Sequence, residues 1–267
     1  MSDSQELFAA DPPSKKFWLL FKIASHERLL QMQQGLLYMN SLDYFSNLKD
    51  EESLPLRTDE LENVCGVLRA GKHDQGFSTL SVRIGGGEEI NLGPEAVITA
   101  RFPMPKNYML FCMSALADGP DGKIPGEVDD QIYLDARLLN FGSHLLLIRN
   151  PAEFSNRVSA AIAKEKKLFW TKYFHECFGM VNYRSLENYS GAKGLYTKDS
   201  KYSWQREMRV AFGVHDSLLN TKGAYEFNVG DLSDISQIIP VQSFIDEPIT
   251  ITRRTFESVD GVVRRIG

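Results

Sequence analysis

The chain has 267 residues, of which 43% are hydrophobic and 24% are charged, and its formal net charge is −5 at pH 7. This composition is typical of a globular protein and unlike that of a disordered or collagen-like chain. The acidic balance argues against a broad basic face for duplex nucleic acid. The three cysteines lie far apart in the sequence, so neither a zinc module nor a disulfide framework is indicated.

We expect residues 1–14 to form a flexible N-terminal tail and residues 15–267 to form a single domain. The first residues contain no basic segment followed by an apolar run, so no secretory signal is indicated. No stretch approaches the 18 consecutive apolar residues that a membrane-spanning helix needs. The expected location is therefore the cytoplasm, without a membrane.

Bulky, β-compatible runs alternate with turn signals along the chain, and they predict more strands than helices. We expect strands at 17–23, 36–39, 79–84, 96–102, 108–114, 143–148, 168–183, 204–212, 225–229, 235–241 and 249–253. Capping residues predict helices from Ser25 to Gly35, from Asn40-Ser41 onward, and from Asn150-Pro151 to about residue 166. Loops are expected at 46–75, 118–130 and 190–201. Because these elements lack a βαβ rhythm, we expect an α+β fold around a split, mostly antiparallel sheet.

A charge-dense stretch runs directly into an apolar one at residues 202–212. If the stretch is extended, the side chains of Gln205, Glu207 and Arg209 share one face, opposite Trp204 and Met208. Such a strand could carry a carboxylate into a pocket. An exposed edge strand with solvated charges is the alternative.

Three polar features follow one another along the predicted strands. Lys22 interrupts an apolar run, Ser114 closes a buried strand, and Gln205-x-Glu207 starts a late strand. We expect a cleft formed by strands 17–23, 108–114 and 204–212. The structural alternatives are a lysine extending along a sheet edge and a serine bonded within its own turn.

This order resembles the arginine–serine–glutamate class of mono-ADP-ribosyltransferases. The resemblance implies an ADP-ribosyltransferase-like fold and NAD as the substrate. A fixed carboxylate would stabilise the positive charge that develops on the ribose as the glycosidic bond breaks. In that family the last glutamate, here Glu207, is catalytic, and the residue at Gln205 faces the acceptor.

The same resemblance assigns the remaining site residues. Lys22 and Arg57 would bind the NAD phosphates, Ser114 would support the nicotinamide pocket, and Tyr202 or Trp204 would stack on the substrate. The match covers a few dozen residues and is partial. Lys22 stands where the family has arginine, and lysine cannot make a bidentate phosphate contact. Cys112-Met113-Ser114 keeps one hydroxyl of the family's serine motif.

A protein of this class would transfer ADP-ribose to a macromolecular acceptor, either protein or nucleic acid. The resemblance therefore suggests a toxin or an antiviral, phage-conflict factor, matched by a partner or antitoxin protein. No metal is required, because nicotinamide leaves readily.

A second resemblance spans more of the chain. The segments 35–39 and 42–45, the pattern Arg57-x-Asp59-x-x-Glu62 and a late signature are similar to a group of uncharacterised bacterial and phage-associated proteins. The late signature consists of Lys198, Trp204, Glu207 and Arg209. This resemblance implies that Arg57, Asp59 and Glu62 belong to the same site as Glu207. A loop held by an arginine–aspartate pair is the alternative.

Two other functions remain open. A non-enzymatic protein could grip a ligand or partner through an aromatic-lined surface comprising Tyr38, Tyr44, Phe45, Tyr173, Phe174, Tyr202 and Trp204. A metal-dependent nuclease could use Asp59, Glu62 and Glu207 around a divalent cation, because such cations prefer clustered carboxylates.

Overall fold

The computed structural model describes residues 10, 12–14, 16–47, 61–117 and 131–250, together with the backbone of 255–259 and 262–266. Strands and helices are mixed, and among the described ladders only β13–β15 is parallel. The predicted α+β class with a mostly antiparallel sheet is therefore confirmed. None of the described helices combines the length and the apolar composition that crossing a bilayer requires.

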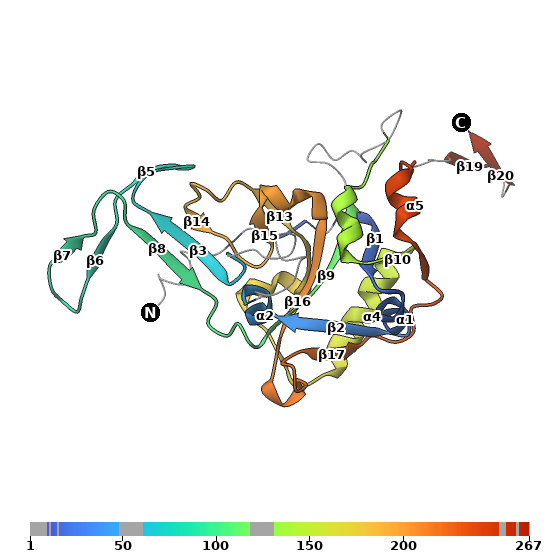
Figure 1. The fold of residues 1–267 in the computed structure, drawn as a ribbon, viewed down its shortest axis with the longest axis horizontal. Helices are drawn as coiled ribbons and strands as arrows, with labels where there is room; N and C mark the ends of the chain where they lie inside the picture. Colours follow the sequence, from blue (N-terminus) through green and yellow to red (C-terminus); the bar gives the residue numbers. More distant parts are fainter. Residues whose placement is uncertain are drawn as a thin grey trace.

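A forked, nine-stranded sheet forms the centre of the molecule (Figure 1). Its strands are β1 (Phe17–Ala24), β2 (Leu36–Ser41), β9 (Tyr108–Ala117), β10 (His144–Ile148), β11 (Leu168–Phe169), β12 (Phe178–Met180), β16 (Glu207–Val214), β17 (Tyr225–Asn228) and β18 (Ser236–Pro240). The main order is β11-β16-β9-β1-β10-β18. The fork lies at β9, which pairs with β1 over its C-terminal half and with β2 over its N-terminal half. The sheet thus opens between β1 and β2.

Helices cover both faces of this sheet. On one face α1 (His26–Gln33) and α4 (Pro151–Lys164) pack against an apolar cluster that includes Leu20 and Ala24 of β1. On the other face the 3₁₀-helix η2 (Ala136–Phe141) and α5 (Val241–Asp246) pack with Phe21 and Ile23. The alternation of side chains along β1 explains this division.

Short sheets extend from this centre. A three-stranded sheet runs in the order β14 (Gly191–Ala192), β3 (Val64–Arg69), β8 (Val97–Arg101). Two hairpins, β4 (Gly71–His73) with β5 (Gly76–Ser78) and β6 (Ser81–Arg83) with β7 (Glu89–Asn91), connect β3 to β8. Residues 71–101, from β4 to β8, project from the body and are called the hairpin arm (Figure 1).

The remaining elements are short. They are α2 (Leu42–Ser46), η3 (Lys172–Cys177), β13 (Asn182–Arg184), β15 (Thr197–Asp199), η4 (Ser200–Gln205), η5 (Asp216–Leu218), β19 (Thr255–Val259) and β20 (Val262–Ile266). The capping signals were informative, since the Ser41 side chain accepts the Tyr44 N–H at the start of α2 and Asn150 accepts the Glu153 N–H at the start of α4.

Several predicted boundaries are wrong. The loop expected at 46–75 contains β3 and β4, because Val64, Cys65 and Val67 are buried and β3 pairs with β8. The loop expected at 190–201 contains β14 and β15, and the strand expected to end at 241 gives way to α5 at Val241. The predicted strand at 168–183 is interrupted by η3, in which His175 adopts a left-handed conformation (φ 42°).

Other predictions fall partly outside the described residues. These are the loop at 118–130, most of the tail at 1–14 and residues 251–253 of the last predicted strand. Within the tail, the Ser14 carbonyl accepts a hydrogen bond from the Met180 N–H at 2.8 Å. Ile249 forms an isolated antiparallel bridge with Ile132.

Gly35 provides a test of the packing between α1 and the turn after β17. It has a φ of +105°, and an added Cβ would lie 2.4 Å from the Gly230 carbonyl oxygen. We expect Gly35→Ala to lower the free energy of unfolding by about 2 kcal/mol or more, because a left-handed conformation and a backbone clash add together. Urea denaturation measures this change. Gly86→Ala, which meets open space without a positive φ, is the control and should stay within about 0.5 kcal/mol of the wild type. Equal stability of the two variants would contradict the close backbone approach.

Candidate functional site

The three strands expected to carry the site are neighbours in the central sheet, in the order β16-β9-β1. Glu207, the first residue of β16, lies opposite Ser114 of β9, and Ser114 in turn lies opposite Phe21 of β1. Directly opposed residues of antiparallel strands project to the same face. Glu207, Ser114 and Phe21 therefore share one face of the sheet.

Glu207 lies in a group of charged side chains that are almost entirely buried. Its two carboxylate oxygens accept hydrogen bonds from Lys198 Nζ at 3.0 Å and from Arg209 Nε at 2.7 Å. Arg209 Nη1 also contacts Glu62 Oε1 at 2.6 Å, as a close ion pair whose angles fall outside those of a hydrogen bond. Five charged side chains, each at most 5% exposed, are called the buried charge cluster: Glu62, Lys193, Lys198, Glu207 and Arg209. Lys193 belongs to it through its charge interaction with Glu62.

A tight turn brings Gln205 to the same cluster. The sequence predicted a strand over 204–212, but residues 200–205 form η4 and the strand begins at Glu207. Arg206 adopts a left-handed conformation (φ 46°, ψ 45°) between them. Gln205 Oε1 accepts a hydrogen bond from Lys198 Nζ at 2.9 Å, the amino group that also binds Glu207. Gln205 and Glu207 therefore both bind Lys198. The shared strand face predicted for Gln205, Glu207 and Arg209 holds only for Glu207 and Arg209, because Gln205 lies outside the strand.

Neighbouring hydroxyl groups fix the start of β16. Ser114 Oγ donates to the Gln205 carbonyl oxygen at 2.8 Å, so its partner is η4 and not its own turn. The Glu207 N–H donates to the Tyr183 hydroxyl at 2.8 Å. Tyr183 lies opposite Lys198 in the parallel β13–β15 pair. Tyr183 thus ties together the strands that supply the lysine and the glutamate, through its hydroxyl to β16 and through its backbone pairing to β15.

Mutual interactions keep Glu62, Lys198, Glu207 and Arg209 ionised. Burial by itself would raise the pKa of Glu207, but the charges of Arg209 and Lys198 together hold that pKa well below its usual value. Burial would also lower the pKa of Lys198, but Glu207 and Glu62 raise it. The formal charges are three cations against two anions, so the described cluster has one excess positive charge.

For Cys112, which lies opposite Arg209 in the sheet, the effect of burial on the pKa is not overcome by neighbouring cations. Burial raises the pKa of the Cys112 thiol, and the negative charge of Glu207 raises it further. The thiol is therefore protonated at neutral pH and is not activated as a nucleophile.

Lys22 does not join Glu207. Its Nζ donates to the Cys112 carbonyl oxygen at 2.6 Å and lies 5.1 Å from the centre of the Phe111 ring. Since Phe21 shares the face of Ser114, alternation along β1 places Lys22 on the opposite face from Glu207. The β1–β9 pairing ends at Phe21 and Ser114, so Lys22 supplies a donor to β9 where the sheet forks.

The two candidate stacking residues are separated. The buried ring of Tyr202 lies 5.0 Å from Lys198 Nζ, beside the cluster. Trp204 instead stacks on Phe141 with a ring-centre distance of 5.7 Å and lies 4.6 Å from the Arg137 guanidinium. Of the two candidates, Tyr202 is therefore the one that lies beside Lys198, the partner of Glu207.

Of the acidic and basic residues predicted at 57–62, only Glu62 is described. It shares Arg209 with Glu207, which agrees with their expected membership of one site. Arg57 and Asp59 lie outside the described residues. Within the part of the chain that is described, no group of three His, Cys, Asp or Glu side chains comes together as a metal site.

Sequence reasoning missed the cationic side of the site. Lys198 and Arg209 stand in the late signature, yet their spacing does not reveal that they are buried beside Glu207. Lys193 and Tyr183 gave no signal, because a lysine in a glycine-rich segment and a tyrosine in a short strand are common on surfaces. Tyr183 is identified only by the convergence of β13, β15 and β16, and Lys193 only by its burial after β14, where its N–H donates to the Cys65 carbonyl oxygen of β3.

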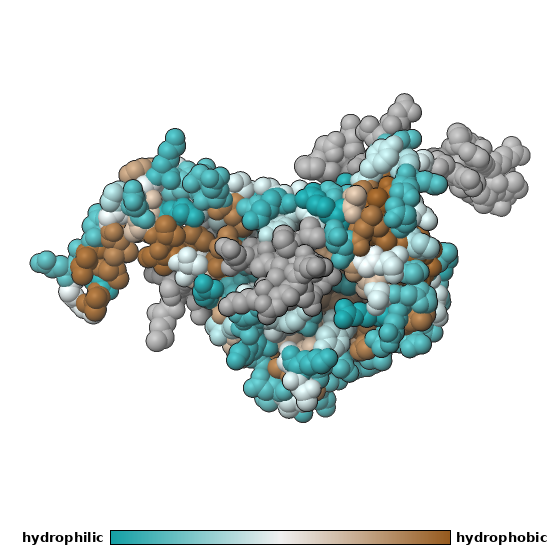
Figure 2. Space-filling model, in the orientation of Figure 1, coloured by the Kyte–Doolittle hydropathy of each residue, from teal (hydrophilic) through white to brown (hydrophobic). Residues whose placement is uncertain are grey.

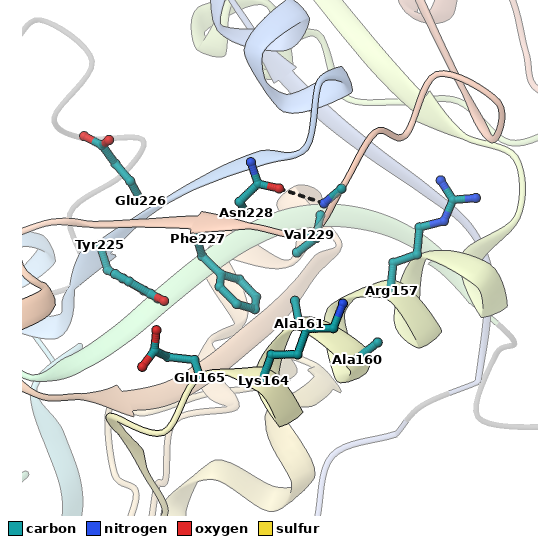
Figure 3. A pocket seen from close by; sticks show the side chains of 11 residues that line it. Arg157, Ala160, Ala161, Lys164, Glu165, Tyr225, Glu226, Phe227, Asn228 and Val229 are labelled. Atoms are coloured by element: carbon teal, nitrogen blue, oxygen red, sulfur yellow. Dashed lines mark hydrogen bonds between the residues drawn. The ribbon is translucent and has the colours of Figure 1, made fainter.

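A hollow of about 580 Å³ lies elsewhere, between α4 and β17 (Figure 3). Arg157 and Lys164 of α4 and Tyr225 and Phe227 of β17 line part of it. Arg157 is engaged with Glu153 at 2.8 Å and with Asp234 at 2.6 Å. No member of the buried charge cluster lines this hollow.

Comparison with known proteins gives no match to a family model, a curated protein or a solved structure. The function is therefore argued from the buried charge cluster and its surroundings.

Removal of one cation tests the energetic coupling within the cluster. We expect Lys198→Met to lower the free energy of unfolding by about 3 kcal/mol, because it leaves one Glu207 oxygen and Gln205 Oε1 buried without their charged hydrogen-bond donor. The double variant Lys198→Met/Glu207→Gln should lose less than the sum of the two single variants, by about 1 kcal/mol or more. Chemical denaturation provides all four values of the cycle. Lys201→Met, which alters an exposed lysine nearby, is the control. If the losses of the two single variants add up to that of the double variant, Lys198 and Glu207 do not interact directly.

Acid titration tests the ionised state of Glu207. Because its pKa in the folded protein lies below the ordinary value of 4.5, its contribution to stability is complete above that pH and is lost as the pH falls through the folded value. We expect the free energy of unfolding to fall between about pH 5 and the acid range, more steeply in the wild type than in Glu207→Gln. Superimposable pH curves for the two proteins would show that Glu207 is not held ionised.

Proposed function

We propose that this protein is an NAD-dependent mono-ADP-ribosyltransferase-like enzyme that transfers ADP-ribose to a macromolecular acceptor. One observation carries the proposal: Glu207, Gln205 and Ser114 meet at the start of β16, where Glu207 is held as an anion. These are three of the residues assigned by the resemblance to the arginine–serine–glutamate class. The split-sheet fold of that class belongs to the same proposal.

The chemistry requires an anion beside the ribose. When the glycosidic bond between nicotinamide and ribose breaks, nicotinamide leaves with the bonding electrons and positive charge develops on the ribose carbon. An acceptor nucleophile then bonds to that carbon and loses a proton. A carboxylate that is already ionised and fixed stabilises this charge without reorganising during the reaction. Glu207 has these properties because Arg209 and Lys198 hold its pKa low.

Lys198 is the partner of Glu207 that would be exchanged for substrate. Arg209 is additionally held by Glu62 and by the Leu195 carbonyl oxygen, so it would stay in place as the fixed support of Glu207. The Lys198 amino group, in contrast, is bonded only to Gln205 and Glu207 among the contacts described. If a ribose hydroxyl of the substrate replaced Lys198 as the hydrogen-bond donor to Glu207, the amino group would be available to bind a phosphate. The excess positive charge of the cluster fits a ligand that carries a pyrophosphate.

Substrate access would involve η4. Tyr202 and Gln205 of this short helix are only 6% exposed and lie against Lys198. A shift of η4 about the left-handed residue Arg206 would uncover the Glu207 carboxylate. An enzyme that consumes NAD in this way suits a toxin or phage-conflict factor restrained by a partner or antitoxin protein.

The proposal is tested by nicotinamide release and by transfer of labelled ADP-ribose to protein and nucleic-acid acceptors. We expect activity in the wild type and a loss of about 100-fold or more in Glu207→Gln. Circular dichroism and thermal melting establish that the variant is folded. Glu226→Gln, at an exposed acid on β17, is the matched control and should retain full activity. A folded Glu207→Gln protein with wild-type activity, or an inactive wild type, would rule out the enzyme.

Gln205→Ala separates the two steps of the reaction. Because the residue at this position faces the acceptor in the resembling family, its removal should reduce transfer to the acceptor more than it reduces nicotinamide release. Equal losses in both steps would contradict the acceptor-facing role.

A non-enzymatic binding protein is the second candidate. It is favoured by the full engagement of Glu207, whose two oxygens are occupied by Lys198 and Arg209 at 5% exposure. Of the aromatic residues predicted for such a surface, Phe174 and Tyr202 are buried and cannot contribute to it, whereas Tyr38 and Tyr44 are exposed. For a binder, Glu207→Gln would change stability and the wild type would show no NAD turnover.

A further inference from the structure

The hairpin arm contains a two-stranded ribbon with one polar and one apolar face. In the β6–β7 pair, Val82 lies directly opposite Ile90, and Arg83 lies opposite Glu89. Arg83 and Glu89 form an ion pair at 3.7 Å on the polar face, where Ser81 also hydrogen-bonds to Glu89. The charges of the ribbon are therefore balanced on one side, and alternation leaves the other side apolar.

The apolar face is exposed to an unusual extent. Val82 is 40% and Ile90 52% exposed. Ile84 (75%) and Leu92 (39%) continue the same alternation beyond the strand ends, where the Leu92 N–H donates to the Leu80 carbonyl oxygen. A soluble chain rarely leaves one entire face of a ribbon apolar and uncovered unless another surface packs on it.

The exposed apolar surface continues along the arm. Phe77 on β5 is 72% exposed, and Val97 and Ile98 on β8 are 48% and 41% exposed. Figure 2 shows this arm as the part of the molecule where hydrophobic surface extends away from the body. Among the described strands, β8 pairs only with β3, so its second edge is open.

We propose that the apolar face of the hairpin arm binds the same face of a second copy of this chain and forms a symmetric dimer. In a two-fold interface the same surface meets itself, so a charged face would bring like charges together. Val82, Ile84, Ile90 and Leu92 carry no charge, and the Arg83–Glu89 pair points away from them. The face is therefore compatible with itself, which a face of one charge sign would not be.

The exposed area of the ribbon fits a weak dimer. The four apolar side chains of this face, Val82, Ile84, Ile90 and Leu92, offer on the order of 350 Å² per chain, less than half of the roughly 800 Å² per partner in a standard interface. An interface of this size is expected to give a dimer in equilibrium with the monomer, not a permanent one. Sheet-on-sheet packing, with two faces about 10 Å apart, is the geometry that buries such surfaces.

The oligomeric state of the full chain in solution tests the proposal. Sedimentation velocity and light scattering over a series of protein concentrations should show a monomer–dimer equilibrium for the wild type. The variant Val82→Lys/Ile90→Lys should be monomeric, with a dissociation constant raised at least 100-fold. Ile84→Lys, at the most exposed of these residues, should weaken the dimer in the same direction.

The matched control places the same charges on the other face. Ser81→Lys/Asn91→Lys alters a directly opposed pair on the polar side of the ribbon, so the dimer should persist. Thermal melting confirms that each variant is folded, which is expected because none of the four positions is buried. A wild type that stays monomeric at every concentration, or a dimer that survives Val82→Lys/Ile90→Lys, would overturn the proposal. Neither outcome depends on NAD turnover.

Discussion

The paired burial of Glu207 with Lys198 and Arg209 is the constraint on which the surrounding structure depends. Removing an ion from water costs several kcal/mol even after the protein relaxes, so each charge requires a close and well-oriented partner. The buried charge cluster lies on the sheet face between two apolar clusters, one containing Leu110 and the other containing Phe21. β13, β15, η4 and β16 must all hold their positions for these contacts to exist.

Two parts of the molecule depart from the usual distribution of residues, in opposite directions. The cluster places five charged side chains in the interior, and the hairpin arm places apolar side chains such as Ile84 and Phe77 in water. Departures of this kind lower the stability of a fold, and proteins retain them mainly at functional sites. The interior charges suit the binding of a charged ligand, and the exposed apolar face suits association. Both features lie outside the main apolar core beneath α1 and α4.

Much of the central fold could be predicted from the sequence. The strands at β1, β9 and β10 appear as apolar runs, and α2 and α4 are marked by Ser41 and Asn150 as caps, because these signals are local. Strands of two or three residues such as β14 and β15 could not be predicted. Their sequences contain no period, and they exist because a partner strand is present.

For the candidate site, the sequence by itself determined which chemical groups are available: a late carboxylate, an amide two residues earlier, a strand-ending serine and nearby cations. It also determined that Glu207 and Arg209 share a face, because alternation is a property of the strand alone. Tertiary structure decided the rest. The Phe21–Ser114 register turned Lys22 to the opposite face, and the left-handed turn at Arg206 brought Gln205 to Lys198. Register and turn geometry depend on contacts between distant segments, and a shift of one residue moves every side chain of a strand to the other face.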